Sequence, residues 1–183
     1  MGVDTDELPD SLKHLPIIDL SGKFRTDTQD LWLSENCFFL WGINNVGTWH
    51  LAHKYNRPTL VTNSYTFPKG FQINLFSLQT IWDDKKKRLL SISEIAALKG
   101  VLGRVTEMKA HSLTYVENLP SELVTYVAEM LSFTNSELKH TEQDRYLLSR
   151  YNEALVKSGY PPMLKNHSRP CISFLRKNQD LLL

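Results

Sequence analysis

The sequence predicts an α/β fold in which a parallel sheet carries flanking helices and the C-terminal third is helical. Two patterns support this prediction. Short apolar runs alternate with helical patterns between residues 17 and 62, and this alternation is typical of parallel strands joined by right-handed crossovers. After Pro120 the apolar residues recur every three or four positions instead, which is the spacing of amphipathic helices.

The composition supports one globular domain and argues against a general nucleic-acid binder. The chain has 183 residues, 42% of them hydrophobic, and a formal net charge of +1. This length can bury one core, and a near-neutral chain lacks the basic stripe of a nucleic-acid binder. The one dense basic run, Lys85–Arg88, follows Asp83 and Asp84, so we expect a solvated loop there.

Cysteine usage and hydropathy predict a soluble, cytoplasmic protein. Cys37 and Cys171 are the only cysteines, and this distant pair implies no disulfide framework, which fits a reducing compartment. No apolar run reaches transmembrane length. The first residues are acidic and unlike a signal peptide. At most a peripheral contact with a membrane is expected.

The first third of the chain predicts three strands and two helices, after an irregular segment at 1–16. The expected strands are Ile17–Leu20, Cys37–Trp41 and Thr59–Thr62. Their apolar residues fit strands that are buried on both faces of a sheet. A helix at 26–36 carries early aspartates that favour the positive end of its dipole, and a second helix, Val46–Tyr55, ends before Pro58.

The rest of the chain turns from strands to helices. We expect a loop at Asn63–Gly70, strands at Leu78–Trp82 and, at a sheet edge, Leu113–Glu117, and helices at Pro120–Leu131, Ser136–Ser158 and Ser173–Leu183. Ser91 and Glu94 form a capping-box pattern ahead of a further short helix. Residues 17–133 are thus expected to form the α/β domain, and residues 134–183 to form C-terminal helices.

The stretch Cys37–Ala52 is the most informative in the sequence. A buried-strand pattern runs into Gly42-Ile-Asn-Asn-Val-Gly47, and a helix begins there. Backbone N–H groups and the positive end of a helix then point at one spot, which suits a phosphate. Ligands of open parallel sheets bind beyond the carboxyl ends of the strands. Three loops meet that condition: Ser21–Arg25, Gly42–Thr48 and Asn63–Gly70.

Eight residues of this region suit a nucleotide diphosphate sugar: Lys23, Asn44, Asn45, Val46, Gly47, Thr48, His50 and Asn63. Gly47 lets the backbone approach closely, Asn44 can bind sugar hydroxyls, and His50 can donate to a phosphate. Tyr65 and Phe67 either stack on a base or, as is commoner for aromatic residues, pack within the protein.

Each feature also has a plain structural explanation. Asn45 can serve simply as the N-cap of the helix, without any ligand. Trp49 fits a core position, and Lys23 is as often solvated as functional. His50 and His53 are three residues apart, as some metal ligands are, but no carboxylate or cysteine set accompanies them. We therefore expect neither a metal site nor a cofactor.

The run from Ile17 to about Thr62 resembles the nucleotide-sugar-binding half of GT-B glycosyltransferases, and most closely the bacterial heptosyltransferases. In these a strand ends in Asn-Asp-Thr-Gly-Pro, a helix continues Met-His-Leu-Ala, and a strand containing proline follows. Here Asn44, Gly47, His50 and Pro58 stand at the matching positions.

The later chain resembles a bacterial family whose members are classed as glycosyltransferases only by their similarity to known ones. The matching segments are Pro58–Asn63, Leu90–Glu94, Ser168-Arg169 and Phe174-Leu175.

The chain also departs from the heptosyltransferase pattern. Asn45, Val46 and Thr48 replace the aspartate, threonine and proline of that loop, and a neutral Asn45 argues against an ADP-heptose donor. The resemblance still implies a Rossmann-like fold, in which the amides of Val46 and Gly47 hold the diphosphate with His50 close to it.

The resemblance implies sugar transfer from a nucleotide diphosphate sugar to a hydroxyl of a glycan or lipid-linked acceptor, in surface glycan synthesis. It identifies no catalytic base; Asp19, Asp83 and Asp84 are candidates by residue type only. The chain corresponds to the donor half alone, so we expect a fragment that works with an N-terminal GT-B half in trans. The alternatives are a non-catalytic nucleotide- or partner-binding module and a fragment with a vestigial site.

The C-terminal apolar residues allow two arrangements. In GT-B proteins the last helix often crosses to the facing domain, and Ile172, Phe174, Leu175 and Leu181–Leu183 would then be exposed in this chain alone. Such an exposed patch would favour association. Alternatively, these residues pack on this domain.

Overall fold

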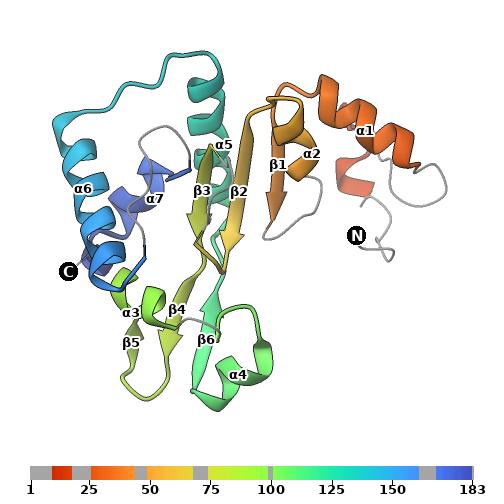
Figure 1. The fold of residues 1–183 in the computed structure, drawn as a ribbon. Helices are drawn as coiled ribbons and strands as arrows, with labels where there is room; N and C mark the ends of the chain where they lie inside the picture. The colour runs from red at the N-terminus through yellow and green to blue at the C-terminus, as the bar shows by residue number, and fades with distance from the viewer. Residues whose placement is uncertain are drawn as a thin grey trace.

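The computed structural model describes residues 10–17, 26–43, 49–67, 74–98, 101–160 and 168–182, apart from the side chains of Leu12 and Trp49. It has a mixed α/β fold (Figure 1), in which a parallel sheet flanked by helices sits above a smaller antiparallel sheet. The strand expected at 17–20 lies outside the described residues from residue 18 onward.

The main sheet has four parallel strands in the order β1-β2-β3-β7. Their bounds are β1 Leu40–Ile43, β2 Thr59–Ser64, β3 Leu75–Leu78 and β7 Arg169–Pro170. Helix α2, Trp49–Lys54, connects β1 to β2 and packs on both strands. The structure therefore confirms the strand–helix–strand unit that the sequence predicts in this region.

The parallel strands differ in burial. Every residue of β2 and β3 is buried, as the continuous apolar runs predict. In β1 the exposed residues alternate with partly buried ones, and Trp41 and Ile43 are exposed. The expectation of burial on both faces is therefore wrong for β1, because among the described strands β1 lies at the edge of the sheet. The expected start at Cys37 is also wrong, since Cys37 caps the preceding helix.

The single strand expected at Leu78–Trp82 is instead a junction between two sheets. The parallel strand β3 ends at Leu78, and β4, Thr80–Asp83, begins after Gln79. The Gln79 amide donates to the Ser64 carbonyl (2.9 Å). The polar residues Gln79 and Thr80 mark this point in the sequence, but they do not show that the chain passes from one sheet to another there.

The second sheet is antiparallel, with strand order β5-β4-β6. It consists of β4, β5 (Arg88–Leu89) and β6 (Leu113–Val116), accompanied by helices α3 (Ile92–Ala97) and α4 (Val105–Ala110). The predicted capping box starts α3, because the Ser91 side chain and Glu94 cap each other. The predicted edge strand at 113–117 is confirmed as β6.

The remaining helices are η1 (Asp10–Leu12), α1 (Asp27–Asn36), α5 (Pro120–Thr134), α6 (Glu142–Lys157), α7 (Ile172–Lys177) and η3 (Gln179–Leu182). Helix α6 begins six residues later than expected. Its N-cap is Thr141, in a capping box with Asp144, while Ser136 has a positive φ of 59° that leads the chain away from α5. The expected C-terminal helix is divided at Asn178 into α7 and η3.

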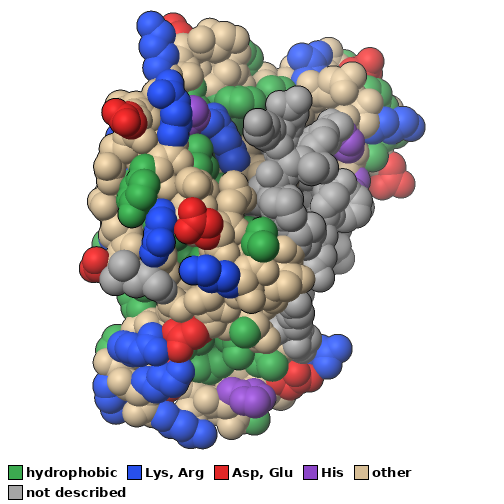
Figure 2. Space-filling view, turned by 60° about the vertical axis from the view of Figure 1, so that its left-hand side comes forward, with side chains coloured by type: hydrophobic (Ala, Val, Ile, Leu, Met, Phe, Trp, Pro, Cys, Tyr) green, Lys and Arg blue, Asp and Glu red, His purple; other side chains and the backbone are tan. Residues whose placement is uncertain are grey.

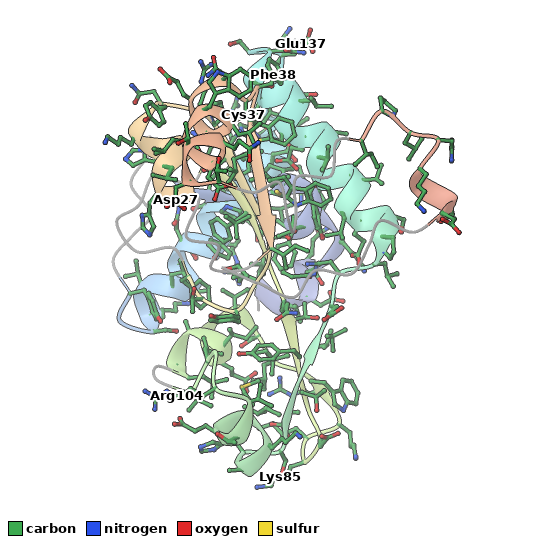
Figure 3. The ribbon with its side chains drawn as sticks, turned by 90° about the vertical axis from the view of Figure 1, so that its right-hand side faces the viewer. Asp27, Cys37, Phe38, Lys85, Arg104 and Glu137 are labelled. Atoms are coloured by element: carbon green, nitrogen blue, oxygen red, sulfur yellow. The ribbon has the colours of Figure 1, made fainter. Side chains whose placement is uncertain are left out.

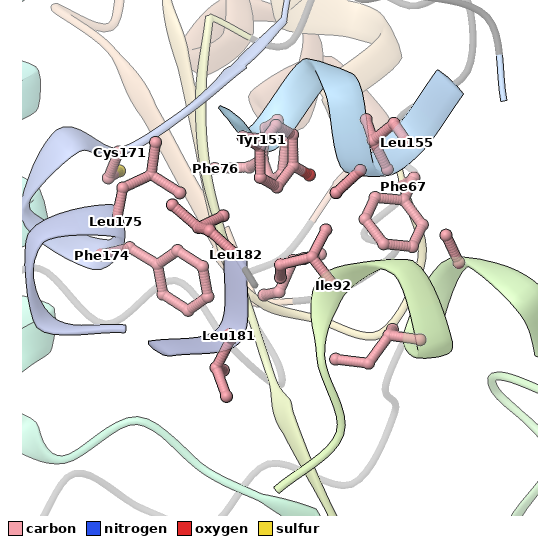
Figure 4. Packing of buried hydrophobic residues seen from close by; sticks show 14 of the residues in the cluster. Phe67, Phe76, Ile92, Tyr151, Leu155, Cys171, Phe174, Leu175, Leu181 and Leu182 are labelled. Atoms are coloured by element: carbon pink, nitrogen blue, oxygen red, sulfur yellow. The ribbon is translucent and has the colours of Figure 1, made fainter. Parts of the chain in front are cut away.

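The core lies between the parallel sheet, α3, α5, α6 and the C-terminal elements. Figure 4 shows Phe76 and Tyr151 near Cys171 and Phe174, with Leu181 and Leu182 close by. The C-terminal apolar residues are therefore buried on this domain, and of the two arrangements considered for them the second holds; Leu183 lies outside the described residues. Within the described part of the chain, no helix has both the length and the apolarity needed to cross a bilayer.

Candidate functional site

The carboxyl ends of β1 and β2 lie side by side, at the place where the sequence predicts a nucleotide site. Ile43 pairs with Thr62 in parallel register, and both strands point toward the antiparallel sheet (Figure 1). Six of the eight expected residues lie outside the described residues: Lys23, Asn44, Asn45, Val46, Gly47 and Thr48. The structure describes the other two, His50 and Asn63.

The strand order itself forms no crevice at this edge. Doubly wound sheets bind ligands at the point where the strand order reverses, and the order of the four described strands runs in one direction only. A ligand at this edge would therefore depend on the loops that follow the strands, above all on residues 44–48.

His50 lies in the first turn of α2, on its exposed side. Ala52, two residues later, is fully buried, which fixes how the helix sits on the sheet. His53 is half-buried. His50 is thus the second residue of the helix that follows β1, and its expected closeness to a diphosphate stays a prediction.

Asn63 is buried at the end of β2, and its side chain is engaged within the protein. Its φ is 50°, and the register between β2 and β3 shifts between Val61 and Ser64, as at a β-bulge. The Asn63 Oδ1 accepts hydrogen bonds from the backbone N–H (2.9 Å) and the Nδ2 (2.7 Å) of Asn118. This oxygen joins the end of β2 to Asn118. The expected contact of Asn63 with a nucleotide sugar stays a prediction.

Asn118 is the centre of a buried polar network that the sequence analysis missed. Its Nδ2 also lies 3.3 Å from Ser77 Oγ and from the Leu78 carbonyl, and its Oδ1 accepts from the Tyr126 hydroxyl (3.2 Å). Burial is the main cause that raises the pKa of Tyr126, so its hydroxyl stays protonated as a donor. A lone asparagine after a short strand was the only sequence signal for this network.

Tyr65 and Phe67 pack within the protein. Phe67 is buried, with its ring centroid 5.1 Å from that of Tyr160. The Tyr65 ring lies beside Gly103, where a Cβ atom would come within 2.7 Å of Tyr65 Cε2. The Gly103 amide donates to the Tyr115 hydroxyl (2.8 Å). These contacts support the plain packing explanation for both aromatic residues.

A second polar cluster lies where β7 leads into α7. The Glu129 carboxylate accepts hydrogen bonds from the backbone N–H groups of Ile172 (2.8 Å) and Ser173 (3.0 Å) and from the Ser173 hydroxyl (2.6 Å). The chain's own carboxylate therefore fills the position that an anion would take at the start of α7.

Asp83, a possible base by residue type only, has a structural role. Its Oδ1 accepts from the N–H groups of Lys85 (2.8 Å) and Lys86 (2.9 Å) in the turn between β4 and β5. The hydrogen bond from Lys86 is the first cause that lowers the pKa of Asp83, and such a carboxylate is a poor base. Asp84 is exposed in the same turn, and Asp19 lies outside the described residues.

Metal ligands do not gather in the described part of the chain. No three His, Cys, Asp or Glu side chains come together there as a potential metal site.

Comparison with known proteins adds no relative. No protein-family model, no curated protein and no solved structure matches this chain.

Proposed function

We propose that this chain binds a nucleotide diphosphate sugar and forms the donor-binding part of a GT-B glycosyltransferase with a Rossmann-like fold. The observation that carries the proposal is the parallel β1–α2–β2 unit. Its register brings the carboxyl ends of the two strands together, and its helix presents an exposed His50 directly after the loop 44–48.

The chemistry of the unit suits a diphosphate leaving group. A loop rich in glycine and asparagine between a strand and a helix offers backbone N–H groups to phosphate oxygens. Hydrogen-bond donors aimed at a departing diphosphate stabilise the charge that develops in sugar transfer. Under this proposal the loop amides and His50 supply those donors, and the acceptor hydroxyl comes from a glycan or a lipid-linked sugar held by a second GT-B half.

Thermal stability in the presence of nucleotides tests the proposal. The purified chain is heated with UDP, GDP, ADP, CMP or their sugar conjugates. A ligand at a hundred times its Kd adds about 2.7 kcal/mol of stability, which corresponds to a rise in Tm of roughly 5–10 °C. We expect such a rise with one base only, lost in Gly47→Trp and reduced in His50→Ala.

The control is His53→Ala, on the same helix but beyond its first turn, which should leave the nucleotide effect intact. A folded chain that responds to no nucleotide would overturn the proposal for the isolated chain.

A second candidate is a partner-binding module without turnover. Large apolar side chains on α1 and around β1 favour it: Trp32, Phe38 and Ile43 are 61%, 58% and 56% exposed. Figure 3 places Phe38 at the end of the molecule opposite Lys85. Under this alternative Phe38→Lys, before the amino end of β1 and away from the carboxyl ends of the strands, would weaken association with the partner half and leave nucleotide binding unchanged.

A further inference from the structure

A groove of about 730 Å³ lies between the β4–β5 hairpin, the start of α3 and the C-terminal helix η3. Its volume falls within the range of small-molecule sites, about 300–1,000 Å³. In Figure 1, β5, α3 and the C-terminus lie on the left, whereas β1 and α2 lie on the right. The groove is therefore separate from the region that carries the proposed nucleotide site.

The apolar part of this groove contains an indole. Trp82, Leu89 and Leu181 line it, and Trp82 pairs directly with Leu89 across β4 and β5, so their side chains share one face of the sheet. Trp82 is half-buried and Leu181 is buried. A half-buried indole in such a place offers a flat apolar surface with a polar edge.

The charged part of the groove is balanced. Two cations, Lys87 and Arg88, and two carboxylates, Glu94 and Asp180, line it. Glu94 is held by Arg88 through contacts of 2.7 and 2.8 Å. The Arg88 hydrogen bonds are the first cause that keeps the pKa of Glu94 far below its usual range. Figure 2 shows lysine and arginine gathered with acidic and hydrophobic side chains at this lower end of the molecule.

Two of these charged groups are available to a ligand. Among the described residues, neither the Lys87 ammonium nor the Asp180 carboxylate has a hydrogen bond or ion pair. The Lys87 backbone is nevertheless fixed, since its N–H donates to the Asp83 carbonyl (2.8 Å) and its φ is 54°. The groove thus combines an apolar surface with one donor group and one acceptor group that have no partner within the described part of the chain.

We infer that this groove binds a neutral saccharide, a function beyond the proposed nucleotide site and independent of it. Sugars have an apolar face of C–H groups that suits an indole and hydroxyls that both donate to a carboxylate and accept from an ammonium. The two carboxylates disfavour a phosphate, and the Arg88 fork that would bind one is taken by Glu94. A peptide strand would need a sheet edge to pair with, and β5 offers only two residues.

Binding to immobilised glycans tests the inference. The full chain is applied to an array of neutral and acidic glycans, and the Kd of a bound neutral glycan is then measured in solution. We expect Trp82→Ala to weaken binding at least tenfold and Asp180→Asn at least threefold. Lys87→Asn should also weaken it, and asparagine tolerates the positive φ at this position.

Trp32→Ala, at an exposed tryptophan on α1, is the matched control and should bind like the unaltered chain. His50→Ala should also bind glycans normally, so that failure of the nucleotide site and failure of the groove are distinguishable. The inference is overturned if a folded chain binds no neutral glycan, if binding survives both Trp82→Ala and Asp180→Asn, or if an acidic glycan is bound in preference.

Discussion

Tyr126 and Tyr151 are two buried tyrosines with different surroundings for the hydroxyl group. The Tyr126 hydroxyl donates to Asn118, whereas the Tyr151 hydroxyl, buried in the aromatic core, has no hydrogen-bond partner among the described residues. A buried hydroxyl without a partner costs about 1–3 kcal/mol. Removing the hydroxyl should therefore relieve this cost at Tyr151 and remove a hydrogen bond at Tyr126.

We expect Tyr151→Phe to raise the free energy of unfolding by about 1 kcal/mol and Tyr126→Phe to lower it by about the same amount. Urea denaturation of the two variants measures both changes. Equal losses of stability in both would show that the Tyr151 hydroxyl has a partner after all.

His140 couples stability to pH. Its Nε2 contacts the Arg169 guanidinium, and because arginine only donates, the ring proton lies on Nδ1. Burial first, and then the charge of Arg169, lowers the pKa of His140. Between the lowered pKa and the ordinary value near 6.5, the unfolded chain binds more protons, so stability falls as the pH falls through this window.

We expect the unaltered chain to lose more stability between pH 7.5 and pH 5.5 than the His140→Gln variant, as measured by denaturation at both pH values. His111→Gln, at an exposed histidine, should retain the full pH dependence. Identical slopes for all three proteins would contradict a role for His140.

At the scale of elements, one ion pair links α6 to α7. Arg176 Nε and Nη2 lie 2.9 Å from the two carboxylate oxygens of Asp144. Asp144 is 1% exposed, whereas the Arg176 side chain is 56% exposed. Burial opposes the charge of Asp144, but hydrogen bonds from Arg176 and Thr141 outweigh it and lower the pKa of Asp144 to about 2.

Removal of either partner should therefore have unequal effects. Arg176→Ala strands a buried carboxylate and is expected to cost about 3–5 kcal/mol. Asp144→Asn leaves a hydrated arginine and should cost about 1–3 kcal/mol. Chemical denaturation at pH 7 compares them, and a larger loss in Asp144→Asn would contradict this account.

Element boundaries could be predicted where a local cap defines them. The Ser91–Glu94 pattern correctly predicts the start of α3, and the acidic first turn predicts α1, which begins after the Thr26 cap. The division of β3 from β4 could not be predicted, because it depends on the pairing of Ser64 with Leu78 and of Thr80 with Val116, far apart in the sequence.

The candidate site shows the same limit. The sequence predicts that strand, loop, helix and strand follow one another, and the structure confirms the strands and the helix of this unit. The sequence alone could not predict that the Asn63 side-chain oxygen accepts hydrogen bonds from Asn118, since these residues are 55 positions apart. The nucleotide-binding role of residues 44–48 stays a prediction.

At the scale of the whole molecule, Asn118 ties the two sheets together. It follows β6 of the antiparallel sheet, and its side chain contacts Asn63 and Ser77 of the parallel sheet. Buried networks of this kind stabilise only when every member has its partner.

We expect Asn118→Ala to lower the free energy of unfolding by about 2–3 kcal/mol, because it leaves buried polar groups unpaired. Hydrogen exchange should show the amides of β4 and β6 losing more protection than those of β2. Thr125→Ala, at an exposed position on α5, is the control. Unchanged exchange in β4 and β6 would contradict the linking role of Asn118.

The two free cysteines should differ in how fast they are labelled, and this difference can report opening of the core. Cys171 is fully buried, and burial raises its thiol pKa well above the ordinary value, whereas Cys37 is only partly buried. Because the thiolate is the reactive form, a thiol reagent should modify Cys37 promptly and Cys171 only during moments when the core opens. The rate of the slow labelling phase would then report how often the core opens, without any introduced probe.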